Sequence, residues 1–426
     1  MTRMKDSGIE WIGEVPEDWG IKPIKHIFAA IGSGTTPDSS KVEYYDGNIN
    51  WLQSGDLYKK DYVYAVSKTI TDLGYRSSAS LRIYQAPFLA IAMYGASIGN
   101  LAISKIDACV NQAVAVLKGE ENIVRFAKLA LEISKTELIF AAQGGTQPNI
   151  NQVLIKNWVI PFPSEIEIKK IADFLDKKVA QLDKIKSLLE EQIKTLEDYR
   201  KSLIYETVTK GLDKTVPLKD SGVDWIGQIP EGWGVKPIKY CSRFQRGFGF
   251  PVELQGNDDG EIPFYKVSDL RGNSDEISIS KNYVDLQTAK QNAWVIVPSG
   301  AIIAPVIGAA LLNNNRKIST VPFISDNNTL AIIPNNKNKY FYYLFKVIDM
   351  NWFNNSSTIP AVNISKLANQ IVPTPKEEEQ KQIADFLEVQ IIKIDKLIEI
   401  KQKQINNINQ QRQTLIYDVV TGKRRV

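Results

Sequence analysis

The apolar residues between positions 161 and 211 follow a seven-residue repeat. A repeat of this kind predicts one long helix with a narrow apolar stripe. A helix of about 44 residues is about 65 Å long, at a rise of about 1.5 Å per residue, and no globular core needs that length. The stripe is too narrow to be buried by itself, so we expect a second helix to pack against it. The stripe consists of Ile168, Leu175, Leu182, Leu189, Leu196 and Leu203, with Ile171, Ile185 and Tyr199 between them.

The second helix is predicted near the C-terminus, where residues 373–423 repeat residues 161–211. The shift is 212 positions (383 − 171), and it carries the motif IADFL at 171–175 onto the same motif at 383–387. Two independent helices in solvent are the alternative interpretation. We favour a packed pair, and two tandem copies predict that the helices are antiparallel and related by a pseudo-two-fold axis.

The start of each copy is also repeated, with a shift of 214 positions (219 − 5). Residues 5–27 read KDSGIEWIGEVPEDWGIKPIKHI, and residues 219–241 read KDSGVDWIGQIPEGWGVKPIKYC. Glycine and proline predict a turn-rich strap here, with the tryptophans as packing anchors. The chain is therefore two copies of one sequence repeat, and each copy consists of a strap, a globular module and a long helix.

The modules, at about 20–160 and 234–372, agree much less than the helices. Short apolar runs between glycines and prolines predict strands, with a helix at 123–133 in the first module and at 339–350 in the second. A shared scaffold with different surfaces is expected if each module reads a different ligand, and drift after duplication is the alternative. The predicted fold class is α+β, with two mixed α/β recognition domains joined by an antiparallel coiled coil. The domain bounds are 1–160, 161–211, 212–372 and 373–426.

Composition narrows the possible chemistry. A net charge of +4 permits a polyanionic partner, whereas two cysteines and one histidine disfavour a disulfide framework, a zinc site and histidine-based catalysis. No signal peptide is evident at the start, and prolines and glycines break the uncharged stretch 293–312 into two predicted buried strands. We therefore expect a cytoplasmic protein that does not interact with membranes.

The sequence contains no complete catalytic motif. The G-x-S-x-G pattern at 95–99 has only His26 as a possible base, and the glycine before Lys423 lacks the upstream glycine of a phosphate-binding loop. The Asn-Pro-Pro-aromatic tetrad of amino-methyltransferases is missing, and carboxylates form no cluster for Mg²⁺. We expect no catalytic residue, no metal and no cofactor. A hidden enzyme in one module and a protein-binding scaffold remain the alternatives.

The repeated strap, the two IADFL helix openings and the endings SLIYETVTKG and TLIYDVVTGK together resemble the specificity subunit of type I restriction–modification systems. This resemblance covers essentially the whole chain. It implies two target recognition domains that each read one half of a split, asymmetric DNA sequence, and helices that set the spacer. It also implies docking of two methyltransferase subunits, joined later by motor–nuclease subunits, in a complex that methylates adenine and cleaves DNA with ATP. Whether methylation and cleavage share one partner chain stays open. The docking surfaces would also allow the isolated chain to self-associate.

The candidate DNA-contacting residues lie in polar loops, where amides suit adenine, arginines suit guanine and lysines suit phosphate. The first module keeps the family's glycine/threonine/proline element at 32–37, whereas the second differs there. In the first module the candidates are Thr35, Thr36, Gln53, Ser54, Tyr58, Lys59, Lys60, Tyr94, Gln143, Thr146 and Gln147. In the second module they are Arg243, Gln245, Arg246, Lys266, Arg271, Asn313, Asn314, Asn315, Arg316, Lys317, Asn354 and Asn355.

Overall fold

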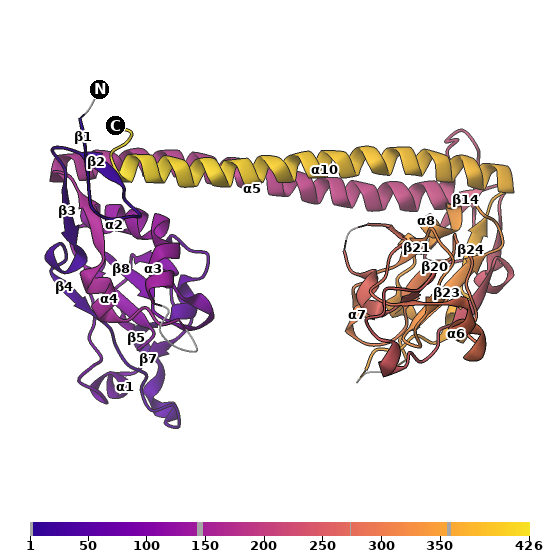
Figure 1. Ribbon diagram of the computed structural model, residues 1–426, viewed down its shortest axis with the longest axis horizontal. Helices are drawn as coiled ribbons and strands as arrows, with labels where there is room; N and C mark the ends of the chain where they lie inside the picture. Colours follow the sequence, from indigo (N-terminus) through magenta and orange to yellow (C-terminus); the bar gives the residue numbers. More distant parts are fainter. Residues whose placement is uncertain (1–2, 143–147, 273, 356–358) are drawn as a thin grey trace. The chain divides into compact units, whose positions relative to one another are not determined.

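The computed structural model describes residues 3–142, 148–272, 274–355 and 359–426. The contacts within it divide the chain into two units, Met1–Glu190 with Gln402–Val426, and Glu191–Lys401. Each unit holds one strap, one module and stretches of both long helices. Figure 1 labels the elements of both units.

The first module is built on a five-stranded sheet in the order β4-β11-β8-β9-β6. All pairs are antiparallel except β6 with β9. Both faces of this sheet are covered, because alternate residues of the central strand β8 enter two different cores. The five strands are β4 (Ala30–Gly32), β11 (Val114–Lys118), β8 (Phe88–Ala92), β9 (Leu101–Ser104) and β6 (Tyr62–Val63).

One face packs against α2 (Glu121–Ile133), which confirms the helix predicted at 123–133. The other face packs beside a three-stranded sheet in the order β10-β5-β7, in which β5 and β10 are parallel. These strands are β5 (Tyr45–Leu52), β7 (Thr69–Ile70) and β10 (Cys109–Val110). The remaining helices of this module are α1 (Asp72–Arg76), α3 (Lys135–Ala141) and α4 (Gln152–Asn157).

The second module repeats this plan. Its five-stranded sheet has the order β16-β23-β20-β21-β18 and its three-stranded sheet the order β19-β17-β22, with β17 and β22 parallel. The strands are β16 (Ser242–Arg246), β23 (Thr329–Pro334), β20 (Ile302–Pro305), β21 (Lys317–Ser319), β18 (Glu276–Ile277), β19 (Tyr283–Val284), β17 (Ile262–Tyr265) and β22 (Ile324–Ser325). The helices are α6 (Leu286–Gln291), α7 (Ala309–Leu312), α8 (Tyr340–Val347) and α9 (Ile364–Asn369). The predicted internal repeat and fold class are confirmed.

The segment 293–312 differs from its prediction of two buried strands. It contains the buried strand β20 followed by the short helix α7, and Gly308 precedes α7 with a φ of 79°. The predicted helix at 339–350 is shorter than expected, because α8 ends at Val347 and a separate 3-10 turn, η8 (Met350–Phe353), follows. Within the described part of the chain, no helix combines the length and apolar character needed to cross a membrane.

The straps form two small sheets in each unit. In the first unit β1 (Met4–Asp6) pairs with β2 (Glu14–Pro16), and β3 (Gly20–Pro23) pairs with β12 (Val159–Phe162). In the second unit β13 (Leu218–Asp220) pairs with β14 (Gln228–Pro230), and β15 (Gly234–Pro237) pairs with β24 (Ile371–Thr374). Each strap therefore closes onto the strand that leads into the long helix of its own copy.

The long helices are α5 (Glu165–Lys210) and α10 (Glu377–Val420), with 46 and 44 residues. The helix α5 begins after Ser164, whose hydroxyl accepts a hydrogen bond from the N–H of Glu167, 3.3 Å away. It ends before Gly211, which has a φ of 73°.

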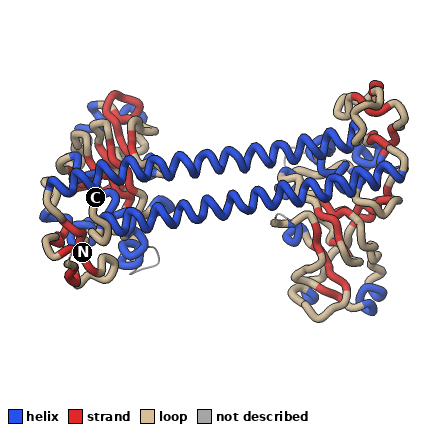
Figure 2. The backbone as a smooth tube through the Cα atoms, turned by 90° about the horizontal axis from the view of Figure 1, so that it is seen from above, coloured by secondary structure: helices blue, strands red, loops and turns tan. Residues whose placement is uncertain are grey.

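The two helices run antiparallel within each unit (Figure 2). In the first unit the start of α5, at Ile168 and Leu175, shares a core with the end of α10 at Val419. In the second unit the end of α5, at Val208, shares a core with the start of α10 at Leu387. The predicted antiparallel pairing is confirmed.

Candidate nucleic-acid interface

The candidate site of the first unit lies where the parallel strands β5 and β10 end. Parallel strands place the residues that follow them at one edge of the sheet. Gln53 follows β5 and Asn111 follows β10, and the N–H of Asn111 donates to the carbonyl of Leu52 at 3.1 Å. We call this the first reading edge, and define it by Thr36, Gln53, Ser54 and Gln112.

A loop after β4 crosses this edge. Gly34 lies against Val110, and a Cβ on Gly34 would stand 1.8 Å from the Val110 carbonyl oxygen, so only glycine fits. The loop then brings Thr36 to Gln112, and the hydroxyl of Thr36 donates to the side-chain oxygen of Gln112 at 2.6 Å. Both of these side chains are exposed. A hydroxyl and an amide therefore share the rim of the edge.

A tight turn holds Gln53 and Ser54 in place. The carboxylate of Asp56 accepts hydrogen bonds from the N–H of Gln53 at 2.9 Å and from the N–H of Ser67 at 3.0 Å. The 3-10 turn η3 (Ser54–Leu57) contacts a second one, η4 (Gly95–Ser97), which follows Tyr94. Tyr94 thus lies beside the edge and packs partly against the core of the module.

The second unit has an equivalent edge at the ends of β17 and β22. Here Gly247 lies against Asp326, and a Cβ on Gly247 would stand 1.9 Å from the Asp326 carbonyl oxygen. The carboxylate of Asp269 accepts from the N–H of Lys266 at 2.8 Å, as Asp56 does from Gln53. The loop at 246–251 differs in sequence from the loop at 32–37 of the first unit, but its backbone follows the same path. We define the second reading edge by Arg246, Lys266 and Asp326.

The two edges differ in charge. The first edge offers hydroxyls and amides, whereas the second offers the cations of Arg246 and Lys266. The ammonium of Lys266 lies 4.8 Å from the ring centre of Phe250. Burial raises the pKa of Asp326, although hydrogen bonds from Asn328 and the charge of Lys266 oppose this rise. The two edges should therefore prefer different base edges in a DNA groove.

The other candidates of the first unit flank its edge. Thr35 is half-buried, and its carbonyl accepts a hydrogen bond from the indole N–H of Trp51 at 3.2 Å. Tyr58, Lys59 and Lys60 follow η3 and are exposed, and the ammonium of Lys59 lies 5.3 Å from the ring centre of Tyr58.

Gln143, Thr146 and Gln147 lie outside the described residues. After them, the N–H of Ile150 donates to the carbonyl of Met93, the residue before Tyr94, at 2.8 Å.

The candidates of the second unit divide by exposure. Arg243, Arg246, Arg271, Asn313 and Asn355 are exposed, and Gln245, Lys266, Asn314, Asn315 and Asn354 are half-buried. Some of these side chains already serve the fold. The Gln245 amide donates to the Arg246 carbonyl at 2.7 Å, and the Asn354 side-chain oxygen accepts from the N–H of Ala361 at 3.0 Å.

Arg316 and Lys317 are buried, with 3% and 6% of their surfaces exposed, which disfavours the predicted DNA contacts. One Arg316 guanidinium nitrogen, Nη1, donates to the carbonyls of Phe345 and Ile348, at the end of α8. Burial lowers the pKa of Arg316 to about 10. The ammonium of Lys317 donates to the carbonyl of Arg271 at 3.0 Å. Both side chains stabilise the module from inside, because they donate hydrogen bonds to backbone carbonyls.

Sequence reasoning missed Asp56, Asp269 and Gln112. The signal for the two aspartates was available, since residues 49–57 align with 262–270 and place Asp56 over Asp269. The two modules differ at most positions, so an aspartate present at the same position in both indicates that they share a turn there. Gln112 had no such signal, because only the tertiary structure brings it to Thr36.

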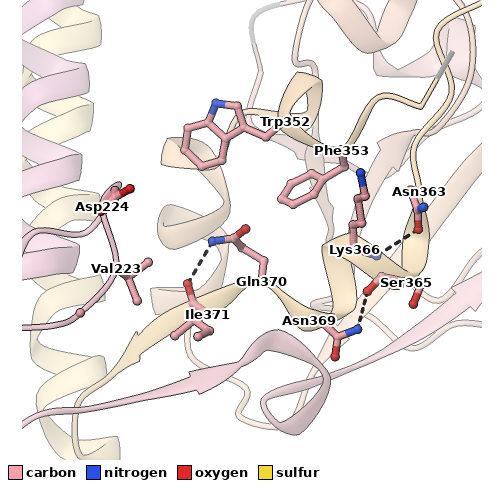
Figure 3. A pocket seen from close by; sticks show the side chains of 11 residues that line it. Val223, Asp224, Trp352, Phe353, Asn363, Ser365, Lys366, Asn369, Gln370 and Ile371 are labelled. Atoms are coloured by element: carbon pink, nitrogen blue, oxygen red, sulfur yellow. Dashed lines mark hydrogen bonds between the residues drawn. The ribbon is translucent and has the colours of Figure 1, made fainter.

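A hollow of about 670 Å³ lies under the strap of the second unit (Figure 3). In the first unit Trp11 stacks on Trp158 with ring centres 6.5 Å apart. The repeat places Gln370 at the position of Trp158, and Trp225 pairs instead with Trp352 from η8, at 5.9 Å. Gln370 and Trp352 line the hollow. It therefore lies where the two copies pack the first tryptophan of the strap against different residues.

Two divergent modules on one scaffold, each with its own polar edge, define a bipartite recognition protein. The model of the type I restriction modification DNA specificity domain matches residues 16–196 and again residues 230–410, with the same shift of 214. The chain therefore belongs to this family and carries two specificity domains. Among described residues, no group of three or more histidine, cysteine, aspartate or glutamate side chains could hold a metal ion. By its family and its relatives, the chain is the specificity component of a type I restriction enzyme.

A relative agrees with this assignment, and two solved structures share the fold. The chain is 26% identical over 440 residues to the type I restriction enzyme MjaIX specificity subunit of Methanocaldococcus jannaschii, covering 97% of this chain and 95% of the relative. A chain from the structure of a type I restriction–modification system, described for its complex assembly and conformational transition, matches with a TM-score of 0.74 at 13% identity, over 95% of this chain and 98% of that one. The HsdS subunit of Thermoanaerobacter tengcongensis matches with a TM-score of 0.54 at 14% identity, over 96% of this chain and 98% of that one.

Proposed function

We propose that the chain directs a type I restriction–modification complex to a bipartite, asymmetric DNA sequence. Each reading edge contacts one half of the target, and the antiparallel helices set the unread gap between them. The observation that carries this proposal is the pair of equivalent edges with different chemistry. Equivalent backbones place both edges alike, and different side chains give them different preferences.

We assign the contacts as follows. In the first half, Thr36, Gln53 and Ser54 contact base edges, while Lys59 and Lys60 contact phosphates. In the second half, Arg246 contacts a guanine and Lys266 a base edge or phosphate. The flanking candidates Thr35, Tyr58, Tyr94, Gln143, Thr146 and Gln147 in the first half, and Arg243, Gln245, Arg271, Asn313, Asn314, Asn315, Asn354 and Asn355 in the second, complete the two surfaces. Arg316 and Lys317 are left out because they are buried.

The proposed domains are recognition domains at 1–160 and 212–372 and helical spacers at 161–211 and 373–426. We place the chain in the cytoplasm. Its partners are double-stranded DNA, two methyltransferase subunits and motor–nuclease subunits that join through them.

The helices offer equivalent apolar patches for two copies of one partner. In the first unit Ile185 and Leu188 are 47% and 48% exposed, and in the second unit Leu397 and Ile400 are 47% and 43% exposed. The shift of 212 relates Ile185 to Leu397 and Leu188 to Ile400. Ile185 was expected inside the stripe between the helices, and its exposure makes it available for docking instead. We propose that each patch docks one methyltransferase subunit.

The recognition proposal is tested by selection from a random duplex pool with the chain co-expressed with its methyltransferase partner. A two-part motif with a fixed unread gap is expected, and exchanging residues 20–160 for another module should change one half only. A scaffold that joins two protein-binding modules would instead enrich no sequence, even when the complex is assembled and salt is low.

The docking proposal has its own test. Leu188→Glu and Ile400→Glu should each reduce the methyltransferase bound from two copies to one, as measured by the mass of the complex. Lys184→Glu and Lys396→Glu introduce a glutamate at exposed neighbouring positions, with a larger change of charge (−2 instead of −1), and should leave two copies bound. If both patch variants still bind two copies, the partner docks elsewhere.

A further inference from the structure

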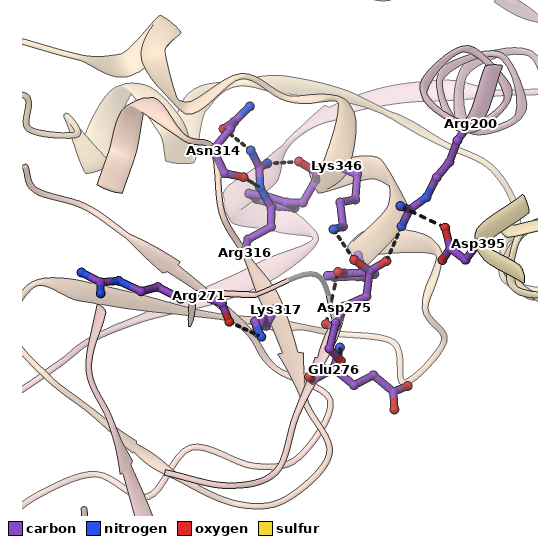
Figure 4. A network of polar contacts seen from close by, with 12 residues as sticks. Arg200, Arg271, Asp275, Glu276, Asn314, Arg316, Lys317, Lys346 and Asp395 are labelled. Carbon is purple, nitrogen blue, oxygen red and sulfur yellow. Dashed lines mark hydrogen bonds and ion pairs between the residues drawn. The ribbon is translucent and has the colours of Figure 1, made fainter. Parts of the chain in front are cut away.

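Arg200 links the second module to both long helices (Figure 4). Its guanidinium on α5 lies 3.2 Å from the carboxylate of Asp275 in the module and 3.3 Å from that of Asp395 on α10. Lys346 of α8 contacts the other oxygen of Asp275 at 2.5 Å. Three helices and the segment just before β18 therefore meet in one ion cluster.

Arg412 does the same in the first unit. Its guanidinium on α10 contacts the carboxylate of Glu132 on α2 and lies 3.3 Å from that of Asp183 on α5. The ammonium of Lys128, which is buried, contacts Glu132 at 3.2 Å and also pairs with Asp61. The first module is thus joined to both helices by a second ion cluster.

The repeat relates the two clusters. A shift of 212 carries Arg200 onto Arg412 and Asp183 onto Asp395, and a shift of 214 carries Asp61 onto Asp275. In each unit the arginine comes from the long helix of the other copy, so it reaches its module across the helix pair.

A separate ion pair already joins each module to the helix of its own copy. Arg125 of α2 contacts Asp176 on α5 at 2.7 Å, and Lys339, just before α8, contacts Glu388 on α10 at 2.5 Å. The shift of 214 relates Arg125 to Lys339, and the shift of 212 relates Asp176 to Glu388. Each module is therefore joined by ion pairs to both helices.

We propose that Arg200 and Arg412 are positioning residues for DNA recognition, each fixing the orientation of one module on the helix pair and thereby the length of the unread gap. This inference rests on the proposed function. Apolar packing resists separation of the module from the helices but has little directional preference. A guanidinium that bridges two carboxylates has fixed geometry, so it resists a tilt of the module. One nucleotide step of B-DNA is about 3.4 Å, so a tilt that moves a reading edge by about 3.4 Å changes the gap by one step.

Partial burial of these side chains reduces the screening of their charges by solvent. The Arg200 and Asp275 side chains are 24% and 25% exposed, and those of Arg412 and Glu132 are 17% and 27% exposed. Burial lowers the pKa of Arg412, but Glu132 and Asp183 outweigh this effect, and the pKa is raised overall. Such partly buried, networked pairs are stronger than isolated surface pairs.

The test uses the full chain assembled with its methyltransferase partner and a duplex pool. The pool carries the two half-sites found with the wild-type complex, separated by gaps of every length. We expect Arg200→Ala and Arg412→Ala to reduce the preference for the correct gap over its neighbours by about tenfold, equivalent to about 1.4 kcal/mol. The half-site sequences should stay unchanged. Arg200→Lys keeps the positive charge but lacks the planar guanidinium that bridges two carboxylates, and it should give an intermediate preference for the correct gap.

Lys201→Ala is the matched control, because Lys201 is the next residue of α5, pairs with Asp198 on the same helix and has a side chain that is 80% exposed. If Arg200→Ala does not fold, Asp395→Asn weakens the contact across the helices and should also broaden the gap. A merely structural role would lower stability and overall binding with an unchanged gap preference, and that result overturns the inference. A wild-type complex without any two-part motif would instead contradict the proposed function itself.

Discussion

Gly34 approaches Val110 so closely that a Cβ on Gly34 would stand 1.8 Å from the Val110 carbonyl oxygen, and Gly247 makes the same approach to Asp326 at 1.9 Å. The carbonyl belongs to the backbone and cannot move aside as a flexible side chain would. The two copies differ around these glycines, yet they share this contact. It follows that the loop over each reading edge depends on a glycine.

Gly34→Ala should therefore displace the first loop and weaken recognition of the first half-site, and Gly247→Ala should do the same for the second. We expect a loss of at least tenfold in affinity for targets that carry the affected half, measured by titration with duplexes altered in one half. Gly55→Ala and Gly249→Ala are the matched controls, since a Cβ there meets no atom within 4 Å. Equal losses in the glycine variants and their controls would contradict this account of the loops.

Arg246→Ala should relax sequence preference at one position of the second half-site. A good bidentate contact contributes about 1–3 kcal/mol of discrimination between bases, so the preferred base should lose about tenfold or more of its advantage. Selection from a duplex pool randomised in the second half measures this. Lys337→Ala removes an exposed cation of the same module and should leave the motif unchanged, because Lys337 lies beyond Pro334, which pairs with Ser242 at the opposite end of β16 from Arg246. A uniform loss across all bases would indicate a phosphate contact for Arg246 instead.

Arg316→Ala should lower the stability of the second unit and not its selectivity. The variant leaves the buried carbonyls of Phe345 and Ile348 without this donor, and each unsatisfied group costs about 1–3 kcal/mol. We expect a loss of about 2 kcal/mol or more in urea unfolding, with the surviving folded protein selecting the same motif. Arg271→Ala, which removes an exposed side chain, should unfold like the wild type. An altered motif in stable Arg316→Ala protein would restore the DNA contact predicted from sequence.

The buried thiol of Cys109 should lower the free energy of unfolding of the protein at alkaline pH, compared with its value near pH 8. Burial raises the pKa of this thiol to about 11 from 9.0. The folded state therefore keeps the thiol protonated where the unfolded state ionises. The stabilisation is complete below pH 9 and is lost as the pH rises through about 11, with a loss of about 2 kcal/mol at pH 10.5. Urea unfolding at pH 8 and 10.5 measures it, and Cys109→Ala should show a smaller alkaline loss. An equal loss in the variant would assign it to other groups, such as Tyr265, whose pKa burial raises to about 12.

Local and periodic information predicted much of this protein. The heptad stripe, the two shifts of 212 and 214 and the glycines of the straps indicate two tandem copies joined by paired helices, because helical periodicity and turn chemistry depend on neighbouring residues. The motifs of the repeat also carried the resemblance to specificity subunits. The divergence between the modules indicated where recognition should be sought, since the helices had not diverged as far.

The tertiary structure decided which polar residues face solvent and which serve the interior. Arg316 and Arg246 look alike in a polar loop sequence, yet one satisfies the end of α8 from inside and the other is exposed. Ile185 fits the heptad stripe but is 47% exposed, because a period counted along one helix does not state how far its partner covers it. Thr36 and Gln112 meet although they are 76 residues apart. Burial and such contacts depend on how distant segments pack, and no local pattern in the sequence contains that information.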